Sequence, residues 1–169
     1  MTLKTTPVFL AILLLLIIGC KISPESRLLD EVDSLVTAEK YDSAYHQVLK
    51  MASQFANEKD QAHYHLLLAQ TSYLTYHSLP TDSAIDGAIR YYEQGDDAKK
   101  LADAYYYKAS CLHERGEDIH AIEFYKKAEE TAEKCHDMRL TYKIAESMVR
   151  INRQNGNYDL QLDYARKAL

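Results

Sequence analysis

The sequence predicts an all-α fold built from antiparallel helix hairpins, and three observations carry this prediction. Only three prolines and five glycines occur in 169 residues, and alanine, leucine, glutamate and lysine are frequent, which favours helix throughout. Apolar residues recur at helical spacing in successive segments, and no segment is interpreted as a strand. Gly116 and Gly156, forty residues apart, fit the turns that join paired helices. The length suffices for one domain with a real core.

The central hairpin shows the pattern most clearly. A first helix is expected over residues 101–115 and a second over residues 118–134, with Gly116 at the joint. Large rings fill the space between helices, and small residues let two backbones approach closely. The pattern consists of Tyr105-x2-Lys108-Ala109-x2-Leu112, followed by Ala121-x3-Tyr125 and by Ala128 one turn later.

This spacing resembles the tetratricopeptide repeat (TPR), whose pattern is W-x2-L-G-x2-Y in the first helix and A-x3-F in the second. The resemblance implies an α-solenoid, a right-handed superhelix of stacked antiparallel hairpins. Three features depart from the pattern: Lys108 occupies the usual leucine position, Leu112 replaces the aromatic residue, and no proline closes the unit. The period is nearer 40 residues than the standard repeat of about 34, which predicts longer helices.

The other segments are predicted to complete a TPR-like domain of about four hairpins over residues 25–169. Ser23 is expected to cap the first helix, with Pro24 at its first position. Gln161 stands where a small alanine is expected, so the last hairpin matches less well. A solenoid needs a polar cap over its last apolar face, so we expect the natural chain to continue past Leu169 or a partner to cover this end. The expected helices outside the central hairpin span about 24–38, 41–55, 61–77, 82–95, 136–155 and 158–169.

The first nineteen residues are predicted to be a lipoprotein signal peptide. Lys4 precedes an apolar run over residues 8–18, which is too short for a transmembrane helix of about twenty residues but suits an export signal. The sequence Ile17-Ile18-Gly19-Cys20 resembles a bacterial lipobox, which implies acylation of Cys20 and a lipidated tether over residues 20–24. The expected location is the bacterial cell envelope, with the domain exported and anchored to a membrane. An uncleaved membrane anchor is the alternative.

Catalytic and metal-binding patterns are not found in the sequence. His63 and His65 are two residues apart, so on a helix they point away from each other. No HExxH motif occurs, and no glycine-rich loop follows a strand. We therefore expect no enzymatic activity, no metal and no cofactor. Cys111 and Cys135 are interpreted as small, semi-buried side chains rather than as a disulfide pair.

The resemblance to TPR proteins implies a concave groove, lined by the first helix of each hairpin, that holds a peptide or a protein segment. Most of the affinity is expected from Leu66, Tyr73 and Tyr106, and a basic end of the groove is expected to receive a carboxylate or an acidic segment. The alternative for the basic residues is a solvated helix face. The expected groove residues, related by the forty-residue shift, are His63, Leu66, Gln70 and Tyr73, then Asp103, Tyr106, Ser110 and His113, and then Lys143, Glu146, Arg150 and Arg153.

Three functions are compatible with these features. The first is a lipid-anchored TPR adaptor that holds another protein of the cell envelope. The second is the exported sensor portion of a larger membrane-spanning signalling or transcription regulator. The third, an outer-membrane nutrient-binding lipoprotein, is disfavoured because such chains are much longer. The net charge of −5 gives no electrostatic case for nucleic-acid binding by this segment, and the oligomeric state is left open.

Overall fold

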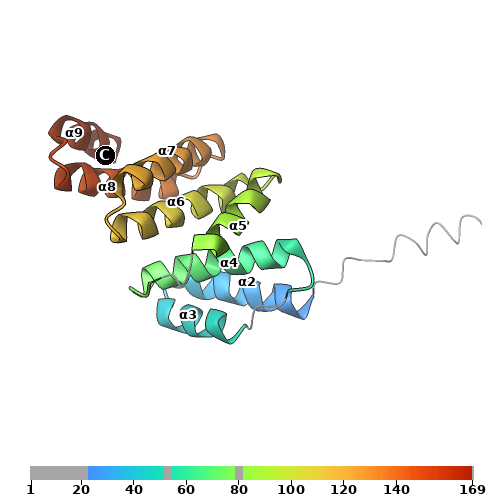
Figure 1. Ribbon diagram of the computed structural model, residues 1–169. Helices are drawn as coiled ribbons and strands as arrows, with labels where there is room; N and C mark the ends of the chain where they lie inside the picture. The colour runs from blue at the N-terminus through green and yellow to red at the C-terminus, as the bar shows by residue number, and fades with distance from the viewer. Residues whose placement is uncertain (1–22, 52–54, 79–81, 169) are drawn as a thin grey trace, which may run out of the picture.

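The computed structural model describes residues 23–51, 55–78 and 82–168, and these form eight α-helices and no strand (Figure 1). The predicted all-α fold is confirmed. The expectations for the signal peptide and for Cys20 concern residues outside this described part. The helices are α2 (Pro24–Thr37), α3 (Tyr41–Lys50), α4 (Glu58–Leu74), α5 (Asp82–Glu93), α6 (Ala98–Glu114), α7 (Asp118–Lys134), α8 (Met138–Gln154) and α9 (Tyr158–Lys167).

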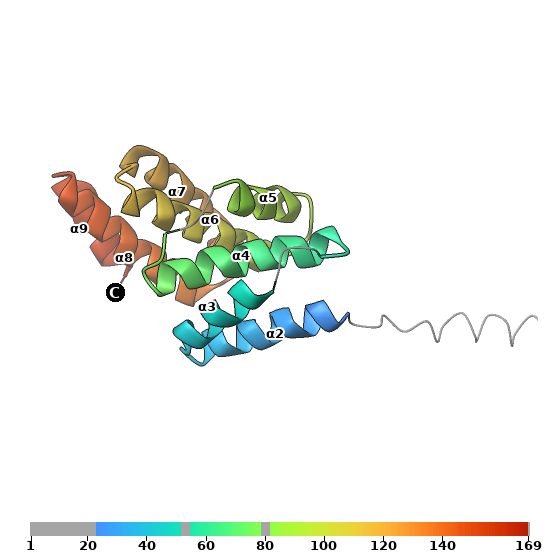
Figure 2. The ribbon, with the colours of Figure 1, turned by 60° about the horizontal axis from the view of Figure 1, so that its bottom comes forward.

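The helices pair into four antiparallel hairpins that follow one another along the molecule (Figure 1, Figure 2). The first helices of the hairpins, α2, α4, α6 and α8, contact one another in sequence order, and each second helix contacts the first helix of the next hairpin. Within the described residues, no second helix contacts another second helix. The first helices therefore form a continuous inner row. The right-handed superhelix stays a prediction.

The forty-residue period holds along three of these first helices. Helices α4, α6 and α8 start at residues 58, 98 and 138, and each contains 17 residues. Asn57, Asp97 and Asp137 precede them, and each side chain accepts a hydrogen bond from the backbone N–H three residues further on. Such caps satisfy N–H groups that have no partner inside the helix. For this reason α4 and α6 begin about three residues earlier than apolar periodicity alone suggested.

The same three helices also end in register. Tyr76, Gly116 and Gly156 follow them with φ values of 59°, 77° and 72°. The next N–H in each case donates a hydrogen bond to the carbonyl five residues earlier, which is the Schellman arrangement. Tyr76 differs from the two glycines because a residue with a Cβ is strained in this left-handed conformation. Its side chain is 92% exposed, so no packing within the described chain compensates for that strain.

Two hydrophobic cores lie beneath the inner row. The main core runs from α4 to α9, and Ala109 and Ala121 are fully buried in it, as the hairpin pattern predicted. Tyr107 and Tyr125 are its largest fully buried side chains. A smaller core joins the first hairpin to α4 through Leu29, Val32, Ala44, Val48 and Leu67. The first hairpin thus has a hydrophobic contact surface of its own.

Lys108, which occupies the leucine position of the TPR pattern, ties α5 to α6. Its ammonium group is buried and lies 3.0 Å from Asp82 and 3.1 Å from Asp86. Arg115 adds two hydrogen bonds of 2.8 Å to the Asp82 carboxylate. Burial raises the pKa of Asp82, but the hydrogen bonds from Arg115 and Lys108 outweigh it and lower this pKa. An ionic link thus replaces the expected apolar contact.

Two further expectations concern cysteines and membrane helices. Cys111 is buried, Cys135 is partly buried, and both are free thiols. Burial raises the pKa of Cys111 to about 12, which makes this thiol a poor nucleophile. Among the described residues, no helix combines the length and the apolar character that crossing a membrane requires.

Candidate functional site: a two-part groove on the inner helices

The inner row of helices carries an open groove composed of two adjoining cavities. The first has a volume of about 480 Å³, and we call it the charged cavity. The second has a volume of about 610 Å³, and we call it the tyrosine cavity. Tyr41 and Leu74 line both cavities, so the two adjoin. The groove therefore extends over residues from all four hairpins.

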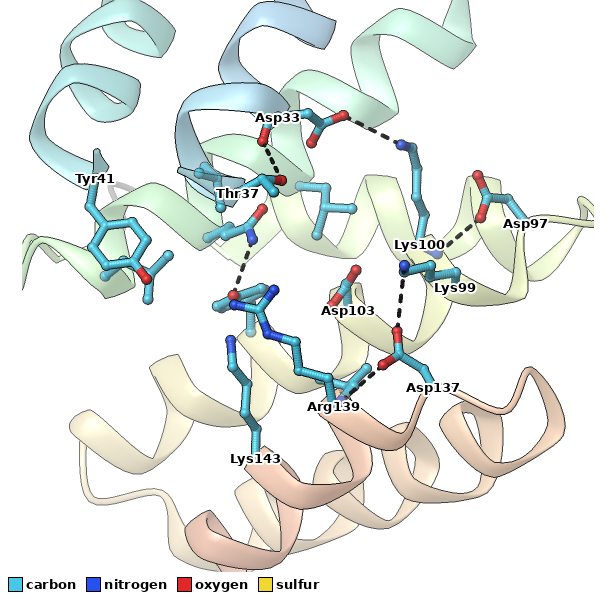
Figure 3. Close-up of a pocket in the computed structure, with 16 residues that line it drawn as sticks. Asp33, Thr37, Tyr41, Asp97, Lys99, Lys100, Asp103, Asp137, Arg139 and Lys143 are labelled. Carbon is cyan, nitrogen blue, oxygen red and sulfur yellow. Dashed lines mark hydrogen bonds and ion pairs between the residues drawn. The ribbon is translucent and has the colours of Figure 1, made fainter. Parts of the chain in front are cut away.

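The charged cavity is lined by acids and bases in equal number (Figure 3). Some of them pair at its edge: Lys99 lies 3.8 Å from Asp137, and Lys100 lies 3.7 Å from Asp33. Both pairs are longer than a charge-assisted hydrogen bond, so they leave the groups accessible to a ligand. The eight charged residues are Asp33, Asp97, Asp103, Asp137, Lys99, Lys100, Lys143 and Arg139.

Asp103, Lys143 and Arg139 are the charged groups of this cavity that lack a close partner among the described residues. Figure 3 shows Asp103 projecting from α6 into the cavity, with Lys143 extending toward the same space from α8. No hydrogen bond or ion pair joins either side chain to another residue in the described part of the chain. Burial, followed by the negative charge of Asp137, raises the pKa of Asp103 to about 6. Burial and the nearby charge of Arg139 lower the pKa of Lys143. The cavity thus offers one acid and two bases that are incompletely neutralised.

The tyrosine cavity lies at the opposite ends of the inner helices and is lined by Tyr41, Tyr73 and Tyr76 together with Arg150. The guanidinium of Arg150 donates a hydrogen bond of 3.4 Å to the hydroxyl of Tyr73. The Tyr73 ring packs edge-on against Tyr106, with ring centroids 6.5 Å apart. These rings form a rigid, amphipathic surface, which is the type of surface that protein interfaces favour.

Seven of the twelve predicted groove residues line one of the two cavities. The charged cavity contains Leu66, Gln70, Asp103 and Lys143, and the tyrosine cavity contains Tyr73, His113 and Arg150. Gln70 donates a hydrogen bond of 3.1 Å to the hydroxyl of Tyr107, and His113 lies 2.7 Å from Asp118. Both side chains are therefore held by neighbours within the groove.

The other five predicted residues lie outside the cavities. Tyr106 is only 6% exposed and Ser110 is fully buried, because Tyr125 of α7 packs against the Tyr106 ring and lies 3.1 Å from the Ser110 hydroxyl. The hydroxyl of Ser110 donates to the Tyr106 carbonyl at 2.9 Å. Tyr106 therefore supports the groove from beneath instead of facing a ligand. His63 lies against Asp33, Glu146 accepts a hydrogen bond from Tyr142, and Arg153 is exposed elsewhere.

The predicted basic end is divided in the structure. Lys143 lies in the charged cavity beside Arg139, whereas Arg150 lies in the tyrosine cavity. Arg153 lines neither. The three predicted cations therefore form no single positive patch, and Lys143 and Arg150 belong to different cavities.

The sequence interpretation missed several groove residues, although the forty-residue recurrence marks some of them. Lys99 and Arg139 occupy the same position in successive repeats, forty residues apart, and Lys59 occupies it in the repeat before. Asp97 and Asp137 recur in the same way because they are helix caps. Asp33 and Tyr41 belong to the first hairpin, which does not follow this register, so no sequence signal placed them here.

No known family model matches the chain, and no curated protein or solved structure matches it either.

Proposed function

We propose that the protein is a TPR-like scaffold that binds an extended segment of a partner protein in the two-part groove. The observation that carries this proposal is that the charged and tyrosine cavities adjoin along the inner helices and share Tyr41 and Leu74. Most of the groove residues lie on α4, α6 and α8, which pack on the main core and hold these residues in fixed positions. Such preorganisation reduces the entropy lost on binding.

The lining of the groove favours a segment that carries both charges and an apolar or aromatic side chain. Asp103 is available to a cation of the partner, and Lys143 is available to an anion. Tyr73 and Tyr76 offer ring surface to an apolar side chain in the adjoining cavity. The charged contacts set the orientation of the segment and its association rate, whereas the tyrosines supply most of the affinity.

The sequence supports placement of this scaffold in a bacterial cell envelope. The short apolar run before Ile17-Ile18-Gly19-Cys20 is typical of an exported lipoprotein, and acylation of Cys20 would anchor the domain to a membrane. Several acyl chains hold a protein stably where one chain does not. Labelled palmitate is expected to enter the native protein and not the Cys20→Ser variant, and equal labelling of both would contradict the anchor.

The groove is tested by recovery of partners from envelope extract with matched variants. Lys143→Glu and Arg153→Glu make the same charge change on the same helix, but only Lys143 lines a cavity. We expect Lys143→Glu to lose the partner in a salt-sensitive manner, Tyr73→Ala to lose it at any salt concentration, and Arg153→Glu to retain it. Equal recovery by all three variants would show that binding does not use the groove.

A further inference from the structure

We propose that Asp30, Asp33 and His63 form a binding site for a divalent transition-metal ion, for which Zn²⁺ is the best probe. One carboxylate oxygen from each aspartate and one ring nitrogen of the histidine all lie within 4.8 Å of one another. Asp30 and Asp33 are three residues apart on α2, so their side chains share one face of that helix. His63 approaches them from α4, the inner helix of the next hairpin.

The imidazole of His63 is a buried nitrogen ligand beside the two carboxylates. Its side chain is only 10% exposed, and its Nε2 atom lies 2.8 Å from Oδ2 of Asp33. Among the described residues Asp33 is the close partner of this nitrogen, but their contact does not have the geometry of a hydrogen bond. Buried ring nitrogens are normally hydrogen-bonded or bound to a metal, because an unsatisfied polar atom in the interior is unfavourable. A metal ion between the imidazole and the carboxylates would satisfy it.

The donor set selects the kind of ion. Ca²⁺ and Mg²⁺ prefer sites composed of oxygen ligands, whereas Zn²⁺ accepts histidine nitrogen and carboxylate oxygen together. Three protein ligands leave a further position for water or for a group of the partner. His63 is buried, Asp33 is partly buried and Asp30 is exposed, so the site has an open side through which an ion enters.

The site adjoins the groove, and the positive charge of Lys100 lies next to it. The ammonium of Lys100 lies 3.7 Å from Oδ2 of Asp33, and both residues also line the charged cavity. A bound cation therefore competes with Lys100 for this carboxylate. By joining α2 to α4, the ion would fix the first hairpin, with its separate small core, against the rest of the molecule.

The test is calorimetric titration of the full chain with Zn²⁺, in mild detergent because of the apolar run over residues 8–18. We expect one ion per chain, and a loss of affinity of about tenfold or more in Asp30→Asn and in His63→Ala. Asp30 is exposed, so its variant remains informative even where His63→Ala fails to fold. The matched controls Glu31→Gln and His65→Ala, on the same two helices, are expected to bind as the native chain does.

A fifth variant examines the opposing charge. Lys100→Met is expected to tighten Zn²⁺ binding, because the competing ammonium has been removed. Absence of Zn²⁺ binding by the native chain, or equal affinity in Asp30→Asn, His63→Ala and the controls, would overturn the site. An unchanged affinity in Lys100→Met would show that the ion does not contact Asp33, and would overturn the three-residue site as well.

Discussion

Replacement of Asp103 by asparagine is expected to stabilise the fold near neutral pH. The pKa of this carboxyl group is raised from 3.8 to about 6 in the folded protein, first by burial and then by the charge of Asp137. As pH rises from about 4 to 6, the unfolded chain releases this proton before the folded chain does. Folding stability therefore falls across that window, and the full destabilisation is present above about pH 6. Asparagine has no charge to desolvate, so the variant escapes this effect.

The size of the gain follows from the shift in pKa. A difference of about two units corresponds to about 3 kcal/mol, since one unit is about 1.4 kcal/mol. Asp103 lines a groove that is open to solvent, and solvent screening reduces this figure to about 1–2 kcal/mol. For a chain of this size, about 1 kcal/mol changes the melting temperature by roughly 2–4 °C, so a rise of roughly 2–8 °C is expected.

The measurement is thermal unfolding followed by circular dichroism at pH 7.5 and at pH 4. The gain in Asp103→Asn should appear at pH 7.5 and almost vanish at pH 4, where the native carboxyl is protonated in the folded state. Asp96→Asn is the control, because Asp96 is an exposed aspartate just before α6. A variant that is no more stable than the native chain at pH 7.5, or that gains equally at both pH values, would refute the reasoning.

Four other substitutions test three features of the fold by urea unfolding. Ala109→Leu is expected to overpack the main core and to lower stability by about 1–3 kcal/mol, and an unchanged midpoint would mean that the hairpin register is wrong. Tyr76→Gly is expected to raise stability by about 1 kcal/mol, because glycine adopts a positive φ without strain, whereas Gly116→Ala should lower it. Lys108→Met is expected to lower stability by about 1–3 kcal/mol, because Asp86 loses its buried partner. Unchanged stability of this variant would show that the ionic link between α5 and α6 contributes nothing to the fold.

The parts of the fold that depend on neighbouring residues in the chain were predictable from the sequence. Gly116 and Gly156 end their helices with positive φ as expected, because glycine is favoured in that conformation. The forty-residue period was visible in the same two glycines and in the pair Ala69 and Ala109. Ala109 is buried because a small residue is required where two helices approach closely.

The parts that depend on contacts between hairpins were not predictable in the same way. The spacing placed Tyr106 beside the groove, but its burial depends on the rings of Tyr73 from α4 and Tyr125 from α7, which no property of α6 encodes. Lys108 departs from the TPR pattern, and its role becomes evident only when Asp82 and Asp86 of α5 lie next to it. Spacing within one helix relates His63 to His65 only. Asp33 belongs to another hairpin, so its approach to His63 has no signal in that spacing.

The common register of α4, α6 and α8 has an evolutionary consequence. Each of these helices starts after a capping residue at 57, 97 or 137 and ends before a left-handed residue at 76, 116 or 156. A duplication or deletion of forty codons whose two ends fall within these first helices would therefore rejoin two equivalent backbone positions. The recombined chain would keep its caps and its helix lengths, and the groove would become longer or shorter by one hairpin. Unequal crossing-over thus offers a direct route by which related genes come to encode grooves of different reach.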